Sequence, residues 1–240
     1  MNSTRHLVLG AARSGKTRFA LNIAKSLAQS SASEVIYVAT AEAHDAEMRE
    51  RIARHRAERP TNWRTLEAPR ELARELASIK RRGSSGVFAA ALNAHSSGEN
   101  VARDAATSSE HHALTDMLAP VTAASSDRRA LTEVLPPSAA ASIIVIDCLT
   151  LWLSNAILSD FREDDPGGPL PTWARERETF LTWLEACDHP LILVSNEVGG
   201  GIVPTSALAR RFQSEQGWLN QDVAALCEQV IQWLAQLRDE

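Results

Sequence analysis

The sequence of 240 residues has little cysteine, no excess of basic side chains and no long hydrophobic run. Its three cysteines, Cys148, Cys187 and Cys227, are odd in number and far apart, and no pair of them has CxxC spacing. Such cysteines suggest neither a disulfide framework nor a zinc site, and they fit a reducing compartment. The sequence therefore predicts a cytoplasmic protein.

The shortage of positive charge narrows the choice of partners. The formal net charge is -5, whereas proteins that bind a nucleic-acid backbone usually concentrate lysine and arginine on one surface. The apolar stretches around Ile143 and Leu191 are too short to span a bilayer, and the first residues enter a strand pattern instead of the apolar core of a signal peptide. We therefore expect neither a nucleic-acid partner nor a membrane span.

Short apolar runs separated by helical patterns make up most of the chain. The runs at 6–10, 34–40, 143–148 and 191–196 predict buried parallel strands, and helices are predicted over 16–29 and 45–58. This alternation is typical of an α/β fold whose sheet is covered on both faces. The length and the hydrophobic content of 44% predict a single domain over 1–240.

One long stretch departs from this alternation. Residues 82–141 are rich in Ala, Ser, Asn and Thr, contain Gly-Ser-Ser-Gly and Pro-Pro, and have little periodicity. This composition predicts a flexible surface insertion. A loop of that length without structure is unusual inside a compact domain.

A phosphate-binding motif follows the first strand. It matches G-x-x-x-x-G-K-[ST] and consists of Gly10, Ala11, Ala12, Arg13, Ser14, Gly15, Lys16 and Thr17. In such a loop backbone N–H groups and the helix N-terminus face the phosphates, Lys16 reaches the outer phosphates, and the Thr17 hydroxyl can bind Mg²⁺. A chance glycine turn would not explain why strand, motif and helix follow in register. The motif predicts a RecA-like P-loop NTPase fold, a three-layer sandwich with a mostly parallel central sheet.

A carboxylate ends the third apolar run. Asp147 follows Ile143, Ile144, Val145 and Ile146, as in a Walker B strand whose acid helps to hold Mg²⁺. An Asp in this position can also simply cap the following turn.

His55 lies on the predicted helix at 45–58 and shares a face with Met48 and Ile52. Four arginines lie close to it in the sequence: Arg51, Arg54, Arg56 and Arg59. The cationic surroundings suit phosphates and make His55 a candidate catalytic residue. The alternative is a structural histidine on a solvated basic helix face.

The segment 196–204 follows the fourth strand and contains three adjacent glycines. Its position at the carboxyl end of a parallel strand is where open α/β sheets bind ligands. The alternative is an ordinary flexible connection.

Taken together, these residues resemble the bifunctional adenosylcobinamide kinase and adenosylcobinamide-phosphate guanylyltransferase family of cobalamin biosynthesis. The matching pieces are residues 10–17, 37–41, 47–48, 51–52 with His55, 59–60, 63–67, 147–150 with Asn155, 195–199 with 201–204, 209–210 with Phe212, and Gly217 with 220–221. They follow the family's order at both ends of the chain. Two departures are the longer insertion before Asp147 and the segment 229–237, which reads less clearly as a final strand.

The resemblance implies an enzyme that phosphorylates adenosylcobinamide and then transfers GMP from GTP, through a guanylylated histidine, to the phosphorylated corrinoid. It implies His55 as the nucleophile, and His44 is a rival that lacks the family's spacing. GTP contacts are implied for the P-loop and for Thr40, Ala41, Glu42, Arg56, Ala57, Glu58, Arg59, Glu67 and Asp147. ATP and GTP are implied as substrates, Mg²⁺ as the metal at Thr17 and Asp147, and a homotrimer as the assembly.

Two other functions remain open from the residues themselves. One is a P-loop kinase of another small molecule, in which His55 is structural. The other is a non-catalytic GTP-binding regulatory module that signals by loop ordering. Only the guanylyltransferase would form a covalent nucleotidyl protein.

Overall fold

The computed structural model describes residues 4–79 and 141–234, and these contain six strands and six helices. The strands are β1 (Arg5–Gly10), β2 (Val35–Ala39), β3 (Arg64–Glu67), β4 (Ile143–Asp147), β5 (Leu191–Asn196) and β6 (Gln229–Trp233). The helices are α1 (Lys16–Ser31), α2 (Ala46–Ala57), α3 (Leu72–Ala77), α5 (Leu149–Asp160), α6 (Pro171–Ala186) and α7 (Ala207–Ala225).

The strands form one sheet in the order β3-β2-β4-β5-β1-β6. Every strand pairing in the described residues is parallel, so the expected mostly parallel sheet is entirely parallel there. All five residues of β2 and four of the five in β4 are buried, because helices cover both faces of a parallel sheet. The predicted α/β class is confirmed.

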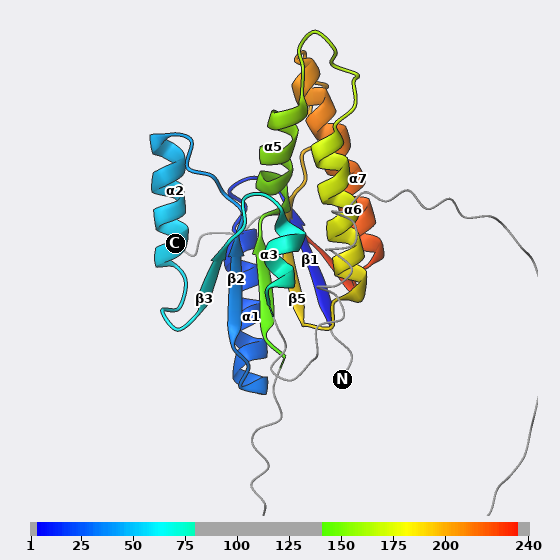
Figure 1. The fold of residues 1–240 in the computed structure, drawn as a ribbon. Coiled ribbons are helices and arrows are strands. Elements are labelled where there is room, and N and C mark those ends of the chain that lie inside the picture. Colours follow the sequence, from blue (N-terminus) through cyan, green and yellow to red (C-terminus); the bar gives the residue numbers. More distant parts are fainter. Residues whose placement is uncertain (1–3, 80–140, 235–240) are drawn as a thin grey trace, which may run out of the picture. The chain divides into compact units, whose positions relative to one another are not determined.

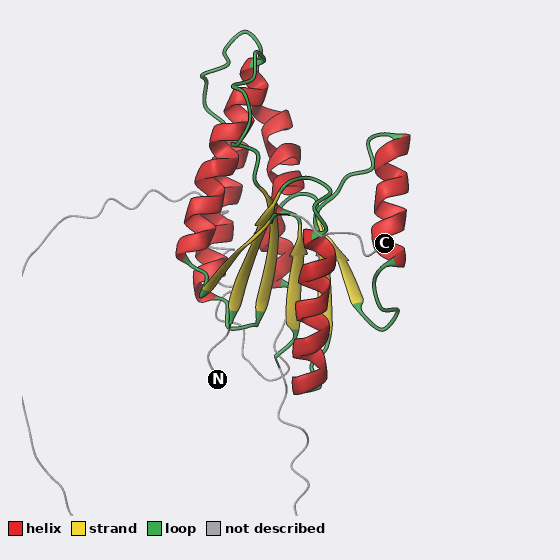
Figure 2. Ribbon diagram, turned by 180° about the vertical axis from the view of Figure 1, so that it is seen from behind, coloured by secondary structure: helices red, strands yellow, loops and turns green. Residues whose placement is uncertain are grey.

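The helices lie on both sides of the sheet (Figures 1 and 2). Helix α1 covers one face, where its buried residues Ala20, Leu21 and Ala24 pack against strand side chains such as Val145 and Ile192. Helices α3, α5, α6 and α7 cover the other face. Helix α2 stands beside the β3 edge, and each of its residues is at least partly exposed. These layers form the three-layer sandwich that the P-loop predicted.

The core beneath α5 and α6 is aromatic. The Trp152 ring packs edge-on against Trp173 at 5.1 Å and against Phe180 at 5.0 Å between ring centroids. Both indole N–H groups are satisfied, since Trp152 donates to Glu176 and Trp173 donates to Glu215. The two buried carboxylates thus satisfy the indole N–H groups of this core.

Register brings the carboxyl ends of four strands to one edge of the sheet. Gly10 lies opposite Asn196 in the β1–β5 pair, and Ala39 lies opposite Asp147 in the β2–β4 pair. The P-loop leaves the sheet at this edge, which is where open α/β sheets bind ligands.

The predicted insertion at 82–141 falls almost wholly outside the described residues. Within the described residues, helices of the length and apolar character needed to cross a membrane are absent.

Candidate nucleotide site

A cavity of about 560 Å³, which includes its open mouth, lies at the carboxyl edge of the sheet. Its lining comes from the P-loop, the ends of β2, β3, β4 and β5, one face of α2, the segment after α2 and the first turn of α5. The lining residues are Lys16, Thr17, Tyr37, Ala39, Ala41, Met48, Arg51, Ile52, His55, Arg59, Glu67, Asp147, Cys148, Leu151 and Asn196.

The P-loop is held in a turn that needs unusual backbone angles. Gly15 has a φ of 89°, which favours glycine, and Arg13 has a φ of 60°. Gly15 begins α1 without a side-chain cap, so the first N–H groups of the helix remain available for an anion. Ser14 O accepts a hydrogen bond from the Trp233 indole at 2.9 Å, which ties the loop to β6.

Lys16 is buried at the base of this loop. Its Nζ donates to the Ala11 carbonyl at 2.9 Å, which leaves two of its three N–H donors for a ligand. Burial lowers the Lys16 pKa, while the nearby Asp147 opposes this shift. A phosphate that replaced the lost hydration would stabilise the charged ammonium.

Asp147 lies between two hydroxyl groups. Thr17 Oγ1 is 3.4 Å from its Oδ1, and the Tyr37 hydroxyl donates to its Oδ2 at 2.5 Å. Burial raises the Tyr37 pKa, so this phenol stays protonated and acts as the donor. The simple turn-capping alternative for Asp147 therefore does not account for its contacts, which lie inside the cavity.

Helix α2 presents one face to the cavity. Met48, Arg51, Ile52 and His55 recur at helical spacing on this face, and Asp45 caps the helix by accepting a hydrogen bond from Met48 N at 2.7 Å. The predicted helix at 45–58 thus matches α2 with its two cap residues.

The His55 side chain is 25% exposed. Its Nδ1 is buried and has no hydrogen-bond partner among the described residues, although Glu58 Oε2 lies 3.8 Å away. The Glu58 carboxylate thus lies on the Nδ1 side of the ring. His44, in contrast, is 60% exposed, pairs with Glu42 at 3.1 Å and is not among the lining residues. His55 therefore lines the cavity, whereas His44 does not.

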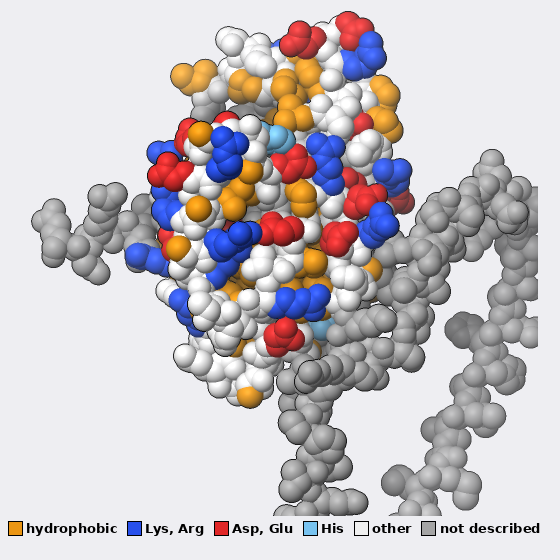
Figure 3. Space-filling model, turned by 60° about the vertical axis from the view of Figure 1, so that its left-hand side comes forward, with side chains coloured by type: hydrophobic (Ala, Val, Ile, Leu, Met, Phe, Trp, Pro, Cys, Tyr) orange, Lys and Arg blue, Asp and Glu red, His pale blue; other side chains and the backbone are white. Residues whose placement is uncertain are grey.

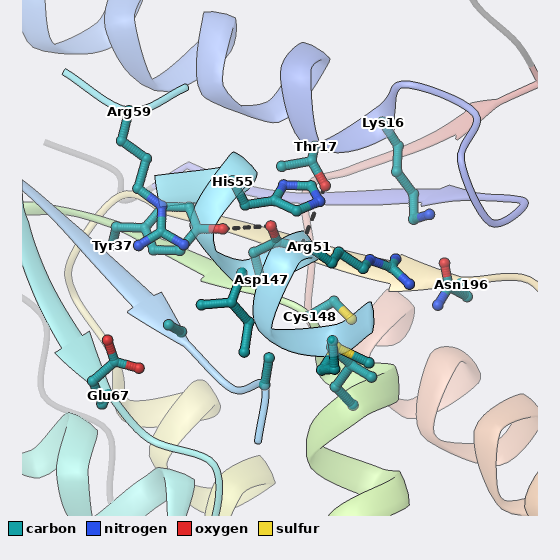
Figure 4. Close-up of a pocket in the computed structure, with 15 residues that line it drawn as sticks. Lys16, Thr17, Tyr37, Arg51, His55, Arg59, Glu67, Asp147, Cys148 and Asn196 are labelled. Carbon is teal, nitrogen blue, oxygen red and sulfur yellow. Dashed lines mark hydrogen bonds between the residues drawn. The ribbon is translucent and has the colours of Figure 1, made fainter. Parts of the chain in front are cut away.

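Arg59 enters the cavity from the segment that follows α2. Its guanidinium carbon lies 3.5 Å from the centroid of the Tyr37 ring. Figure 4 shows the guanidinium over that ring. Its Nε and Nη1 are buried without a hydrogen-bond partner in the described part of the chain. Unpaired buried donors are costly, so this cation is suited to a ligand that brings acceptor oxygens.

The cysteine in the cavity is not a rival nucleophile. Burial raises the pKa of Cys148 to about 11, so its thiol is protonated at neutral pH. Its backbone N–H and carbonyl both bond to the Thr40 hydroxyl at 2.7 Å. Asn155 in turn donates to the Thr40 carbonyl at 2.9 Å, so Thr40 joins three segments beneath the cavity.

The structure brings together seven of the residues predicted to bind ligand or to react. These are Lys16, Thr17, Ala41, His55, Arg59, Glu67 and Asp147. Thr40 is fully buried beneath the cavity. Exposed ion pairs hold Arg13 to Glu47, Glu42 to Arg70, and Arg56 to Glu67. Ligand contacts remain predictions for these residues and for Gly10, Ala11, Ala12, Ser14, Gly15, Ala57 and Glu58.

Three polar lining residues were given no individual role from the sequence, although Arg51 was counted among the arginines near His55 and Asn196 begins the segment 196–204 at the expected ligand edge. The three residues are Tyr37, Arg51 and Asn196. Asn196 is the last residue of β5, and Tyr37 lies two residues before the end of β2. A search for polar residues near the carboxyl ends of the strands would have found both. Arg51 lies on the α2 face already assigned to Met48 and His55.

Neither positive nor negative charge dominates the surface around α2. Figure 3 shows basic and acidic side chains interspersed on this side of the molecule. The arginines on the outer side of α2 thus belong to a mixed, solvated surface, whereas Arg51 and Arg59 line the cavity. Local positive charge at the site comes from these two side chains and from Lys16.

The fold and the site define a P-loop nucleotide-binding protein of the α/β class. Its sequence also matches the family model described as cobinamide kinase / cobinamide phosphate guanyltransferase over residues 6–126 and 122–237. The chain belongs to this family.

Curated relatives agree with this assignment. The chain is 35% identical to the bifunctional adenosylcobalamin biosynthesis protein CobP of Pseudomonas aeruginosa, over 94% of this chain and 90% of the relative. It is 29% identical to the bifunctional adenosylcobalamin biosynthesis protein CobU of Salmonella typhimurium, over 95% of this chain and 93% of the relative. The protein of that name from Escherichia coli is 27% identical over the same shares. These relatives support a role in cobalamin biosynthesis.

Proposed function

We propose that this chain phosphorylates adenosylcobinamide and then transfers GMP from GTP to adenosylcobinamide phosphate through a guanylylated His55. The observation that carries the proposal is that His55 of α2 lines the same cavity as the P-loop lysine and Asp147. A structural histidine would not need to face a phosphate site. Membership in the family supplies the corrinoid as the acceptor.

In the kinase step, a hydroxyl oxygen of adenosylcobinamide attacks the γ-phosphorus of the nucleoside triphosphate. The bond to the β-phosphate oxygen breaks, and the hydroxyl proton is released to solvent. Lys16 and the uncapped N–H groups of α1 stabilise the negative charge that moves onto the leaving diphosphate. Arg51 and Arg59 add positive charge from the α2 side of the cavity. Positioning and charge neutralisation thus supply most of the catalysis.

In the guanylylation step, Nε2 of neutral His55 attacks the α-phosphorus of GTP, and pyrophosphate leaves. Glu58 stabilises the positive imidazole that forms, since its carboxylate lies on the Nδ1 side. A phosphate oxygen of adenosylcobinamide phosphate then attacks the same phosphorus. The P–N bond breaks, His55 is restored, and adenosylcobinamide-GDP is released.

The donor groups near the P-loop fit Mg²⁺. Thr17 and Asp147 offer a hydroxyl and a carboxylate, which are hard oxygen ligands. Clusters of three or more His, Cys, Asp or Glu that could hold a metal are absent from the described residues. The ion would therefore depend on phosphate oxygens for the rest of its ligands, and it would neutralise charge on the triphosphate.

The test is intact-protein mass spectrometry after incubation with GTP and Mg²⁺. Wild type should gain the mass of one GMP, whereas His55→Ala should gain none and should keep part of its kinase activity. His44→Ala is the matched control and should label as wild type does. No mass gain on folded wild type that binds GTP would contradict the proposal and would favour a kinase of another small molecule or a regulatory GTP-binding module.

The remaining expectations stay predictions of this proposal. They are a homotrimeric assembly, a cytoplasmic location, and a single domain that includes the segment 82–141.

A further inference from the structure

Tyr37, the one tyrosine in the sequence, lines the cavity. It is 1% exposed, and its hydroxyl and its ring contact different neighbours. The hydroxyl bonds to Asp147, and one face of the ring lies against Arg59. Tyr37 thus contacts both the candidate metal ligand and a cation next to the helix that carries His55.

The contact with Asp147 follows from strand register. Tyr37 lies opposite Val145, and Ala39 lies opposite Asp147, in the parallel β2–β4 pair. Side chains two residues apart on a strand share a face, so Tyr37 and Asp147 are diagonal neighbours within reach of an aromatic side chain. The small side chain of Ala39 leaves the space between them open.

The Tyr37 hydroxyl makes the two carboxylate oxygens of Asp147 inequivalent. Oδ2 accepts from Tyr37 at 2.5 Å, whereas Oδ1 lies 3.4 Å from the Thr17 hydroxyl. Without the phenol, the carboxylate could rotate about its Cβ–Cγ bond and present either oxygen. With it, Oδ1 is directed toward the P-loop.

The ring has a second task. Arg59 lies two residues beyond the end of α2, and its guanidinium stacks over the ring while two of its nitrogens have no partner among the described residues. A guanidinium over a tyrosine face is held by the ring quadrupole, and its N–H groups remain free at the edges. Stacking therefore fixes the cation without using the donors that a phosphate needs.

We propose that Tyr37 is a positioning residue with two separable parts: its hydroxyl orients Asp147 toward the divalent cation, and its ring orients Arg59 toward the triphosphate. The inference deepens the proposed function, on which it rests for the identity of the ligands. Figure 4 shows the two parts, with the phenol directed at Asp147 and the guanidinium over the ring.

The first experiment removes the hydroxyl alone. Tyr37→Phe keeps the ring, and Mn²⁺ binding is measured by electron paramagnetic resonance in the presence of a non-hydrolysable GTP analogue. Loss of a hydrogen bond to a charged group should weaken Mn²⁺ binding about tenfold. Binding of the analogue without metal should stay within about twofold of wild type, because Arg59 keeps its support.

The second variant removes both parts. Tyr37→Leu should weaken Mn²⁺ binding as Tyr37→Phe does, and it should also weaken metal-free binding of the analogue by about three- to tenfold. Arg59→Gln is the matched control, since it should reproduce only the loss of metal-free binding. Saturating Mn²⁺ should restore covalent labelling by GTP in Tyr37→Phe and leave it reduced in Tyr37→Leu.

A double-mutant cycle excludes a merely structural effect. In an Asp147→Ala background, Tyr37→Phe should cause no further loss of Mn²⁺ binding, because the partner of the hydroxyl is absent. Unchanged Mn²⁺ binding in Tyr37→Phe, or an equal loss in both backgrounds, would overturn the inference. If wild type binds the Mn²⁺ complex of the analogue but forms no GMP adduct, the proposed function fails while this comparison still decides the role of Tyr37.

Discussion

Gly10, at the start of the P-loop, has no room for a side chain. A Cβ at this position would lie 2.4 Å from the backbone oxygen of Trp233, so β1 and the end of β6 could not keep their spacing. We expect Gly10→Ala to lower the free energy of unfolding by about 1–3 kcal/mol, as overpacking does.

Urea unfolding measures this change, and Gly200→Ala is its control. A Cβ at Gly200 would meet no heavy atom of the described residues within 4 Å. The control should therefore unfold as wild type does. Equal stability of Gly10→Ala and wild type would mean that β6 can move away from the P-loop strand at little cost.

At the scale of elements, α2 depends on its cap more than the other helices do. Its residues are all at least partly exposed, so burial contributes little, and the Asp45 carboxylate satisfies an otherwise free N–H at the first turn. Asp45→Ala should destabilise the helix by about 1 kcal/mol. Hydrogen exchange over residues 46–57 should become about fivefold faster, and guanylylation of His55 should slow, while global stability changes little.

The matched control is Ser206→Ala at the start of α7. Ser206 also caps its helix, by accepting from Ala209 N, but α7 buries residues such as Leu219 and Val223. Tertiary packing should hold α7 in place after the cap is lost. Exchange in α2 that did not respond to Asp45→Ala would show that its contacts with the cavity, and not its cap, maintain the helix.

The sequence predicted elements well where the local pattern was strong. Helix α1 was expected at 16–29 and spans Lys16–Ser31, and the four apolar strands lie where the runs occur. Strand β3 was not predicted, and the segment 229–237 read only weakly as a final strand, although Gln229–Trp233 forms β6. Both are sheet edges with several exposed side chains, so they lack a continuous apolar run.

The site could be predicted only in part for a related reason. The P-loop and Asp147 carry local signals, whereas the role of Tyr37 depends on the pairing of β2 with β4, whose strands are more than 100 residues apart in the chain. All of β2 is buried, so burial does not distinguish the face that meets the cavity. Which carboxylate the buried Tyr37 meets is decided by strand order, which local patterns do not contain.

At the scale of the whole molecule, the ligand should connect α2 to the P-loop and to the carboxyl ends of the strands. The cavity draws on the P-loop, α2 and the ends of β2, β4 and β5, while α6 lies away from it on the other face of the sheet. A non-hydrolysable GTP analogue with Mg²⁺ should therefore slow hydrogen exchange in residues 10–20, 46–59 and 145–151. At a hundredfold excess over its Kd, it should raise the stability by about 2.7 kcal/mol.

Exchange in α6 is the internal control, because none of its residues lines the cavity. Its protection should change only as much as global stability does. Protection centred on α6, with α2 unaffected, would contradict the assignment of the cavity as the nucleotide site.

Trp233 gives the P-loop an optical reporter. Its indole stacks on Phe19 at 4.3 Å between ring centroids and donates to the carbonyl of Ser14. Indole emission depends on the electrostatic field and on nearby hydrogen bonds, so a loop that tightens around phosphates would change the fluorescence of this side chain. The difference in emission between wild type and Trp233→Phe would therefore convert each binding event into a change in emitted light.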